Sequence, residues 1–351
     1  MACLQIDKVK IAGISASVPK QQASNMELPL LSERERQQLV RTTGIAFRRI
    51  APPEMCASDL CFEAAAALLK DLEWEADSVE LLVFVSQSPD HLVPGTASQL
   101  QVRLGLSKQV MAIDLNQGCA GYVYGLSVVA SLLASGGIKR ALLLVGDTIT
   151  HTLSAEDKST IPIFSDAGSA TALVHDAASK SMFFNLQTDG QGYQAICIPD
   201  GGSRQPIHSE SFDLKEVATG IKRGDGHLAM QGLDIFNFAL REVAPNIRAL
   251  LDFAKLKIES QDAFVLHQAN LLLNESIRRK LALPIEKVPY SIKDFGNTSS
   301  ATIPVTLVHA LSGRLRSESM QLILSGFGVG LSWGSVALET ENIHCLPLIE
   351  C

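Results

Sequence analysis

The sequence predicts an α/β protein built from two similar halves. Runs such as Val79–Gln87 and Arg140–Val145 are mostly apolar and of strand length, which fits strands that helices cover on both faces. Helical spacing of apolar residues over Ser58–Asp71 and Thr96–Leu104 separates such runs. A chain of 351 residues is also long enough for two domains. We therefore expect parallel strands layered between helices in each half.

Local signals predict the remaining elements of the first half. Gly44 is the expected C-cap of a polar helix, and Ser58 the expected N-cap of the next. Small residues at Ala120 and Gly121 open a long apolar helix. In chain order, these signals add a strand at Val9–Ile14, a helix at Leu31–Thr43, a helix at Ala120–Leu133 and a strand at Ala170–His175.

The second half repeats the order of the first at an offset of 178 to 181 residues. This offset predicts a duplicated unit, although chance matching of short apolar strands is the alternative. A duplication would bring equivalent turns together, and with them Cys119, His267 and Asn297. The matched pairs are Val79–Gln87 with Asp262–Gln268, Gly118 with Gly296 before an apolar helix, and Ala141–Gly146 with Gln321–Gly326.

The duplication divides the chain into residues 1–176, which carry the cysteine, and residues 177–351, which carry the histidine and asparagine. Within the second half, residues 199–226 are polar, rich in glycine and poorly periodic. A long irregular loop of this kind is typical of a lid or a binding surface, and a solvated insertion explains it equally well.

Composition excludes several classes of function. No apolar run reaches the ~18 residues that span a membrane, and the N-terminus lacks the apolar region of a signal peptide. A net charge of −7 makes nucleic acid an unsuitable partner. The seven cysteines are scattered without a Cys-x-x-Cys pair, so we expect neither a disulfide framework nor a metal site, and a cytoplasmic protein.

Cys119 lies where a strand is expected to turn into a helix. An apolar run ends at Leu115, Gly118 supplies the turn, and the helical pattern follows at once. The first turn of a helix carries unpaired N–H groups and a partial positive charge, which stabilise a reactive thiolate. The alternative is a buried cysteine that acts only as a small hydrophobic residue.

His267 and Asn297 follow the corresponding elements of the second half. His267 comes directly after the apolar residues 263–266, at the end of a buried strand, where α/β proteins place ligand sites. Asn297 follows Gly296, which on its own indicates a turn or an N-cap. Residues 325–334 are spaced by glycines, but no helix follows, so close approach of the backbone to a substrate is favoured over a dinucleotide site.

Four motifs together give the chain a family resemblance that covers nearly its whole length. The sequence resembles the β-ketoacyl-acyl carrier protein synthase III family. The resemblance implies a thiolase fold, which is a five-layer αβαβα sandwich with two five-stranded sheets, in a homodimer without cofactors. The motifs are Gly-Cys-Ala-Gly (118–121), His-Gln-Ala-Asn (267–270), Gly-Asn-Thr-Ser (296–299) and Phe-Gly-x-Gly-x-x-Trp-Gly-Ser (327–335).

The resemblance also implies a mechanism. Cys119 attacks an acyl thioester, and the backbone N–H groups of Cys119 and Val329 form the oxyanion hole. Malonyl-acyl carrier protein or malonyl-CoA then loses CO₂, while His267 and Asn297 donate hydrogen bonds to the enolate, and a decarboxylative Claisen condensation gives a β-ketoacyl product. The alternatives are acyl transfer to an amine or alcohol, and a non-catalytic subunit of a heterodimer.

The chain departs from the family where the acyl donor is expected to bind. Gln38 and Thr42 stand where family members use Trp and Arg against CoA, which leaves Arg41 and Lys158 as candidate contacts. Without an aromatic ring to stack on adenine, a carrier-bound acyl donor is favoured over acyl-CoA. Arg278, Arg279 and Lys280 are candidates for docking a carrier protein, or else form a solvated helix face.

Two more residues are expected to contact substrate. Asn270 ends the His-Gln-Ala-Asn motif, and Val93 stands where short-primer enzymes of the family have a bulky Phe. The smaller Val93 leaves room for a longer or branched acyl group. We therefore expect a specialised fatty-acid or polyketide-type pathway.

Overall fold

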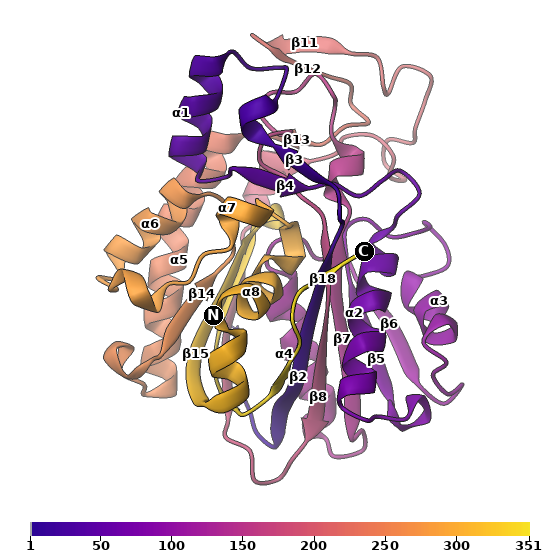
Figure 1. The fold of residues 1–351 in the computed structure, drawn as a ribbon, viewed down its shortest axis with the longest axis vertical. Helices are drawn as coiled ribbons and strands as arrows, with labels where there is room; N and C mark the ends of the chain where they lie inside the picture. The colour runs from indigo at the N-terminus through magenta and orange to yellow at the C-terminus, as the bar shows by residue number, and fades with distance from the viewer. Residues whose placement is uncertain (1) are drawn as a thin grey trace.

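The computed structural model describes residues 2–351 and contains two large β-sheets that are stacked with helices between and outside them (Figure 1). The first sheet has seven strands, and their order along the sheet is β17 (His344–Cys345), β2 (Val9–Val18), β8 (Ala167–His175), β7 (Arg140–Asp147), β5 (Leu81–Val85) and β6 (Met111–Leu115), with β18 (Ile349–Glu350) also paired to β2. The second sheet has five strands, in the order β1 (Ala2–Ile6), β9 (Met182–Thr188), β16 (Ser332–Glu341), β15 (Ser319–Gly328) and β14 (Ala263–Leu266).

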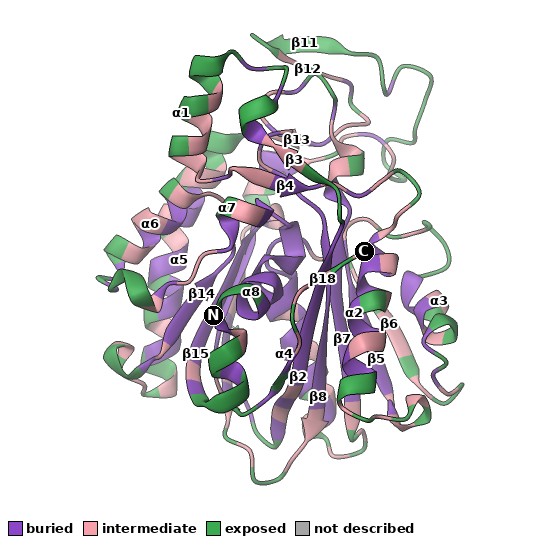
Figure 2. Cartoon of the chain, viewed as in Figure 1, coloured by how far each residue is buried: buried purple, intermediate pink, exposed green. Residues whose placement is uncertain are grey.

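Three layers of helices enclose the two sheets, as Figure 1 shows. The central layer is mostly buried between the sheets, apart from the exposed C-terminal half of its second helix, and each outer layer buries one face and exposes the other (Figure 2). This is the predicted five-layer sandwich of the thiolase fold. The central layer is α4 (Gly121–Ala134) and α8 (Thr302–Ser317); the outer layers are α2 (Ala57–Asp71) with α3 (Thr96–Arg103), and α5 (Gly232–Ala254) with α6 (Leu271–Lys280).

The predicted duplication is visible in the strand pairing. In the first sheet β5 runs parallel to β7, which pairs antiparallel with β8. In the second sheet β14 runs parallel to β15, which pairs antiparallel with β16. The expectation of five strands in each sheet is wrong for the first sheet. Each chain end crosses to the sheet of the other half: β17 and β18, near the C-terminus, pair with β2 in the first sheet, and β1, at the N-terminus, pairs with β9 in the second. The boundary between residues 176 and 177 stays a prediction.

Two local predictions need correction. The helix expected from Ser58 is α2, which starts at Ala57, and its N-cap is Cys56, whose backbone N–H donates to the Asp59 carboxylate over 2.8 Å. The irregular stretch at residues 199–226 contains a hairpin of two short strands, β11 (Lys215–Ala218) and β12 (Ile221–Arg223). The hairpin lies far from both large sheets, beside α1 (Glu33–Thr43) (Figure 1). Gly44 ends α1 in a left-handed conformation, as predicted.

Short elements build the end of the molecule where the first and second sheets present the carboxyl ends of β5, β7 and β14. They are β3 (Gln22–Ser24), β4 (Phe47–Arg49), β10 (Ile196–Cys197), β13 (Ala229–Met230) and α7 (Ile292–Phe295). Among residues 2–351, no helix is long and apolar enough to cross a membrane.

Candidate active site

Cys119 lies at the turn between β6 and α4, as the sequence predicts. The helix begins at Gly121, and the cysteine is only 4% exposed. The neighbouring strand β15 approaches closely because it has glycines there: a Cβ atom added to Gly328 would lie 2.7 Å from the Cys119 Sγ atom. Glycine therefore lets the β15 backbone pack directly against the thiol.

The environment of the Cys119 thiol favours its protonated form. Burial raises the pKa of Cys119 to about 11, and hydrogen bonding from the Val329 N–H acts in the opposite direction. The negative charge of Asp147 raises this pKa further, and the Ser299 side chain lowers it through a hydrogen bond to the thiol. The expected stabilisation of a thiolate by the helix N-terminus is therefore outweighed by burial.

The same contacts bear on the predicted oxyanion hole. The backbone N–H groups of Val329 and Cys119 both hydrogen-bond at the Cys119 sulfur. Two N–H donors that point to one sulfur are also placed near the carbonyl oxygen of an acyl group attached there.

His267 lies at the end of β14 and is only 2% exposed. Burial lowers the pKa of His267 to about 3, with an opposing hydrogen bond to the Ser299 backbone, so the imidazole is neutral near pH 7. Its Nδ1 atom lies 2.7 Å from the Thr302 Oγ1 atom, and its ring forms a T-shaped contact with Phe327, with 5.3 Å between ring centroids.

The Thr302 hydroxyl determines which nitrogen of His267 carries the proton. It lies 3.2 Å from the Ser299 carbonyl oxygen, to which it donates. A hydroxyl that donates there accepts from His267 Nδ1–H, which leaves Nε2 without a proton. The donor role that we expect of Nε2 requires the opposite arrangement, in which the hydroxyl turns and donates to Nδ1.

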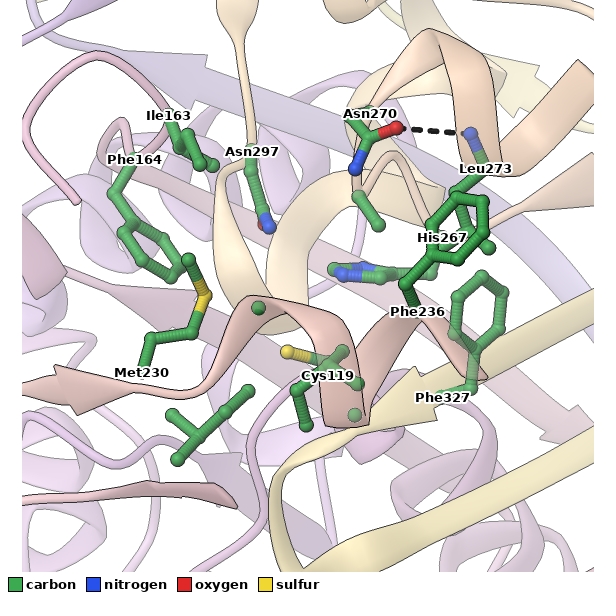
Figure 3. A pocket seen from close by; sticks show the side chains of 15 residues that line it. Cys119, Ile163, Phe164, Met230, Phe236, His267, Asn270, Leu273, Asn297 and Phe327 are labelled. Carbon is green, nitrogen blue, oxygen red and sulfur yellow. Dashed lines mark hydrogen bonds between the residues drawn. The ribbon is translucent and has the colours of Figure 1, made fainter. Parts of the chain in front are cut away.

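Asn297 follows α7 and Gly296, whose φ of 58° is readily adopted by glycine. The Asn297 Oδ1 atom accepts a hydrogen bond of 2.9 Å from the Ser299 N–H. The amide oxygen is thereby engaged in the turn, and the Nδ2 donor is left to face the cavity. Figure 3 shows the side chains of Cys119, His267 and Asn297 converging on this space.

Two cavities meet at Cys119. The histidine-side cavity has a volume of about 110 Å³ and is mostly apolar; besides the three residues above, it is lined by Met230, Phe236, Asn270 and Phe327, among others (Figure 3). The loop-side cavity is larger, at about 450 Å³, and its lining includes Leu92, Cys197, Asp200 and Leu228. An acyl group on Cys119 therefore has space on either side of the sulfur.

Of the other predicted substrate contacts, only Asn270 lines a cavity at Cys119. Asn270 lines the histidine-side cavity, and its Oδ1 atom caps α6 by accepting from the Leu273 N–H over 2.8 Å. Val93 is 85% exposed and lines neither cavity, although its neighbour Leu92 lines the loop-side one. Lys158 lines neither cavity at Cys119 and lies instead in a groove beside α1.

Arg41 does not face that groove. Its guanidinium donates to the Gln38 side chain, and it is not among the residues lining the groove, whereas Gln38 and Lys158 are. Lys158 forms an ion pair of 3.5 Å with Glu35 on α1.

Sequence reasoning missed three polar residues that orient the site. Ser299 contacts the thiol, Thr302 contacts the imidazole, and Asp147 binds the turn that holds both. A signal for Asp147 was present, because it stands just past the apolar run 141–145 at the end of β7, much as His267 follows β14. Ser299 and Thr302 stand in a polar stretch whose individual contacts no periodicity predicts.

Comparisons with known proteins identify the family. Residues 113–190 match the family model described as 3-oxoacyl-[acyl-carrier-protein (ACP)] synthase III, and residues 251–340 match the model of its C-terminal part. A β-ketoacyl-[acyl-carrier-protein] synthase III of Rhodopirellula baltica is 34% identical over 93% of this chain and 97% of its own. The chain belongs to the β-ketoacyl-[acyl-carrier-protein] synthase III family.

Solved structures of this family have the same fold. A 3-oxoacyl-(acyl-carrier protein) synthase from Burkholderia xenovorans superposes with a TM-score of 0.94 at 37% identity, over 99% of each chain. The 3-oxoacyl-(acyl carrier protein) synthase III of Pseudomonas aeruginosa gives 0.83 at 29% identity, over 96% of this chain and 99% of its own. As a member of this family, the chain is an acyltransferase that forms β-ketoacyl products by condensation.

Proposed function

We propose that Cys119 carries the acyl group during this condensation, and that His267 assists its acylation. The pKa of Cys119 of about 11 means that the thiol must lose a proton as it attacks the thioester carbonyl. His267 Nε2, unprotonated in the network with Thr302, accepts that proton and returns it to the leaving thiolate of the donor. The N–H groups of Cys119 and Val329 stabilise the tetrahedral oxyanion.

The second step uses the other tautomer of His267, which forms when Nδ1 gives its proton to water and Nε2 takes one up from water. A malonyl thioester enters the histidine-side cavity and loses CO₂, and the electron pair becomes an enolate. Asn297 Nδ2–H and His267 Nε2–H donate hydrogen bonds to the enolate oxygen while the Thr302 hydroxyl donates to Nδ1. The enolate carbon then attacks the acyl carbonyl on Cys119 and forms the new C–C bond. The C–S bond to Cys119 breaks, and the cysteine thiolate takes up a proton from water.

The orientation of Asn297 is the observation that carries this proposal. Its oxygen is engaged by the Ser299 N–H over 2.9 Å, so its amide N–H group serves as the donor in the cavity. Transfer of the acyl group to an amine or alcohol forms no enolate and needs no such donor. Condensation therefore explains the site better than the non-condensing alternative.

The groove beside α1 favours a carrier-bound acyl donor over acyl-CoA. Lys158, the cation that we expect to contact CoA, is already paired with the Glu35 carboxylate. The negative charge of Glu35 repels the phosphates of CoA, and among residues 2–351 no aromatic ring lines the groove for the adenine to stack on. Arg41, turned to Gln38, contributes little. The extender is malonyl-acyl carrier protein or malonyl-CoA.

We further propose that the loop-side cavity takes the acyl chain and that a homodimer completes it. The cavity exceeds the needs of an acetyl group, which supports a longer or branched acyl chain in a specialised pathway. Val93 is exposed in one chain, so its contact with the acyl group requires a second copy of the protein. The seven cysteines are all free thiols among residues 2–351, which supports a reducing, cytoplasmic place of action.

Intact-protein mass spectrometry with a panel of acyl-CoA and acyl-carrier donors tests the proposal. We expect a covalent mass increase that a Cys119→Ser variant does not show, and larger adduct yields from medium-chain acyl-carrier donors than from acetyl-CoA. Release of CO₂ on adding a malonyl thioester separates condensation from simple transfer. The absence of any adduct with every donor contradicts the proposal.

A further inference from the structure

Asp147 is a fully buried carboxylate at the end of β7 that binds both halves of the molecule. Its Oδ1 atom accepts hydrogen bonds from the Ser86 hydroxyl, the Gln87 N–H and the Ser88 hydroxyl, at 3.1, 2.8 and 3.3 Å. Its Oδ2 atom accepts from the N–H and the hydroxyl of Ser300, at 3.2 and 2.6 Å. One oxygen therefore binds the segment after β5, and the other binds the short turn before α8 in the opposite half.

The residues on either side of Ser300 contact the three reactive side chains. Ser299 hydrogen-bonds to the Cys119 thiol through its side chain and to Asn297 through its N–H. Thr302, two residues beyond Ser300, contacts the His267 imidazole. A shift of this short turn would therefore move the imidazole and the amide relative to the thiol together.

We propose that Asp147 is a positioning residue that fixes the turn at residues 297–302 against the Cys119 elbow, and so sets the alignment of the two halves of the active site. The inference rests on the proposed roles of Cys119, His267 and Asn297. All five hydrogen-bond donors to Asp147 are uncharged hydroxyl or backbone N–H groups, and no cation is among them. A neutral anchor of the same shape would hold the turn with less force, because hydrogen bonds to a charged acceptor are the stronger ones.

The charge gives the proposal an independent readout. Asp147 raises the pKa of Cys119 and also that of Cys61, which is fully buried. Asp90 and Arg103 act on Cys61 as well. The other titratable groups that line the two cavities at Cys119 are His267, Cys197 and Asp200. Removing the charge of Asp147 therefore lowers the pKa of Cys119, while weakening the turn slows condensation.

The test compares Asp147→Asn with two matched variants. Ser300→Ala keeps the charge and removes one hydrogen bond to it, whereas Asp166→Asn removes another buried carboxylate, which binds Ala51 and Thr150 instead. Each variant is assayed for condensation and for the pH dependence of iodoacetamide labelling at Cys119, located by peptide mass spectrometry. Thermal unfolding confirms that each variant is folded.

For Asp147→Asn we expect condensation to fall at least about tenfold, while the labelling midpoint moves down by about 0.5 pH unit or more, which is about threefold more thiolate at a fixed pH. Ser300→Ala should slow condensation with the midpoint unchanged, and Asp166→Asn should leave the midpoint where it is. The proposal is overturned if Asp147→Asn condenses within twofold of the wild type, if its midpoint does not move, or if Ser300→Ala has no effect on condensation. Iodoacetamide labelling needs no acyl donor, so it tests Asp147 independently of the proposed function. If the proposed function is wrong, the wild type itself forms no acyl adduct on Cys119.

Discussion

The elbow at Cys119 and the turn at Asn297 occupy equivalent places in the two halves, each in front of a central helix, but they differ in hydrogen bonding. The Cys119 side chain has few contacts besides N–H groups and one hydroxyl, and it borders two cavities. The Asn297 turn is cross-linked by Ser299, Ser300 and Thr302. A thiol with few contacts suits a nucleophile that must form and break a covalent bond. A cross-linked turn suits the Asn297 amide, which must keep one orientation as a hydrogen-bond donor.

The largest effect concerns the elbow alone. Because burial raises the pKa of Cys119 to about 11, little thiolate exists at pH 7. The rate of Cys119 alkylation should rise roughly tenfold for each pH unit, and about a thousandfold between pH 7 and pH 10. The measurement is iodoacetamide labelling followed by mass spectrometry. A plateau already at pH 7 would mean that the helix N-terminus outweighs burial.

Closing the space beside the thiol should disable the elbow. In Gly328→Ala, the added Cβ would lie 2.6 Å from the Cys119 Cβ and 2.7 Å from its Sγ, so the thiol or β15 must shift. We expect the acylation rate to fall about a hundredfold. Gly313→Ala is the control, since a Cβ there meets no atom within 4 Å. Equal acylation rates in the two variants would refute this view of the packing.

A change in the turn should act on the second step instead. Asn297→Asp keeps an oxygen for the Ser299 N–H, but it replaces the amide donor by a negative charge where the enolate forms. Condensation should fall about a hundredfold, because one oxyanion donor contributes roughly 3 kcal/mol. Acylation of Cys119, followed as the adduct mass, should change little. Equal reductions in the acylation rate and the condensation rate would show that Asn297 does not act in condensation alone.

The smallest effect is expected at Thr302. Thr302→Val removes the hydroxyl that contacts His267 Nδ1 over 2.7 Å, whereas Thr302→Ser retains it. Losing this one hydrogen bond should lower the condensation rate about tenfold in the valine variant and much less in the serine variant. Steady-state rates with a saturating malonyl thioester measure it. If serine and valine behave alike, the hydroxyl does not control the imidazole.

Periodicity and duplication predicted the parts of the fold that repeat. The pairing of β5 with β7 and of β14 with β15 follows from apolar runs at a constant offset, and so does the meeting of Cys119, His267 and Asn297. The exchange of the chain ends was not predictable in this way. β17 and β18 have only two residues each, which is too short for a periodic pattern. They form because the edge of β2 is free to pair with them.

The polar contacts of the site were harder to predict for a different reason. Asp147 and Ser300 are 153 residues apart, and no pattern in either segment reports their contact. The pKa of Cys119 depends on how completely the surroundings exclude water, which a local motif does not encode. The helix N-terminus was therefore a correct prediction of place and a wrong one of protonation state.

The most direct test of a division of work between the two halves is a two-step mass measurement on Asn297→Ala. The variant is first incubated with an acyl donor and then with a malonyl thioester, beside the wild type. We predict that the acyl adduct forms on Cys119 in both proteins, and that it disappears from the wild type on adding the malonyl thioester but persists in the variant. An adduct that never forms in the variant, or that discharges at the wild-type rate, would contradict the account.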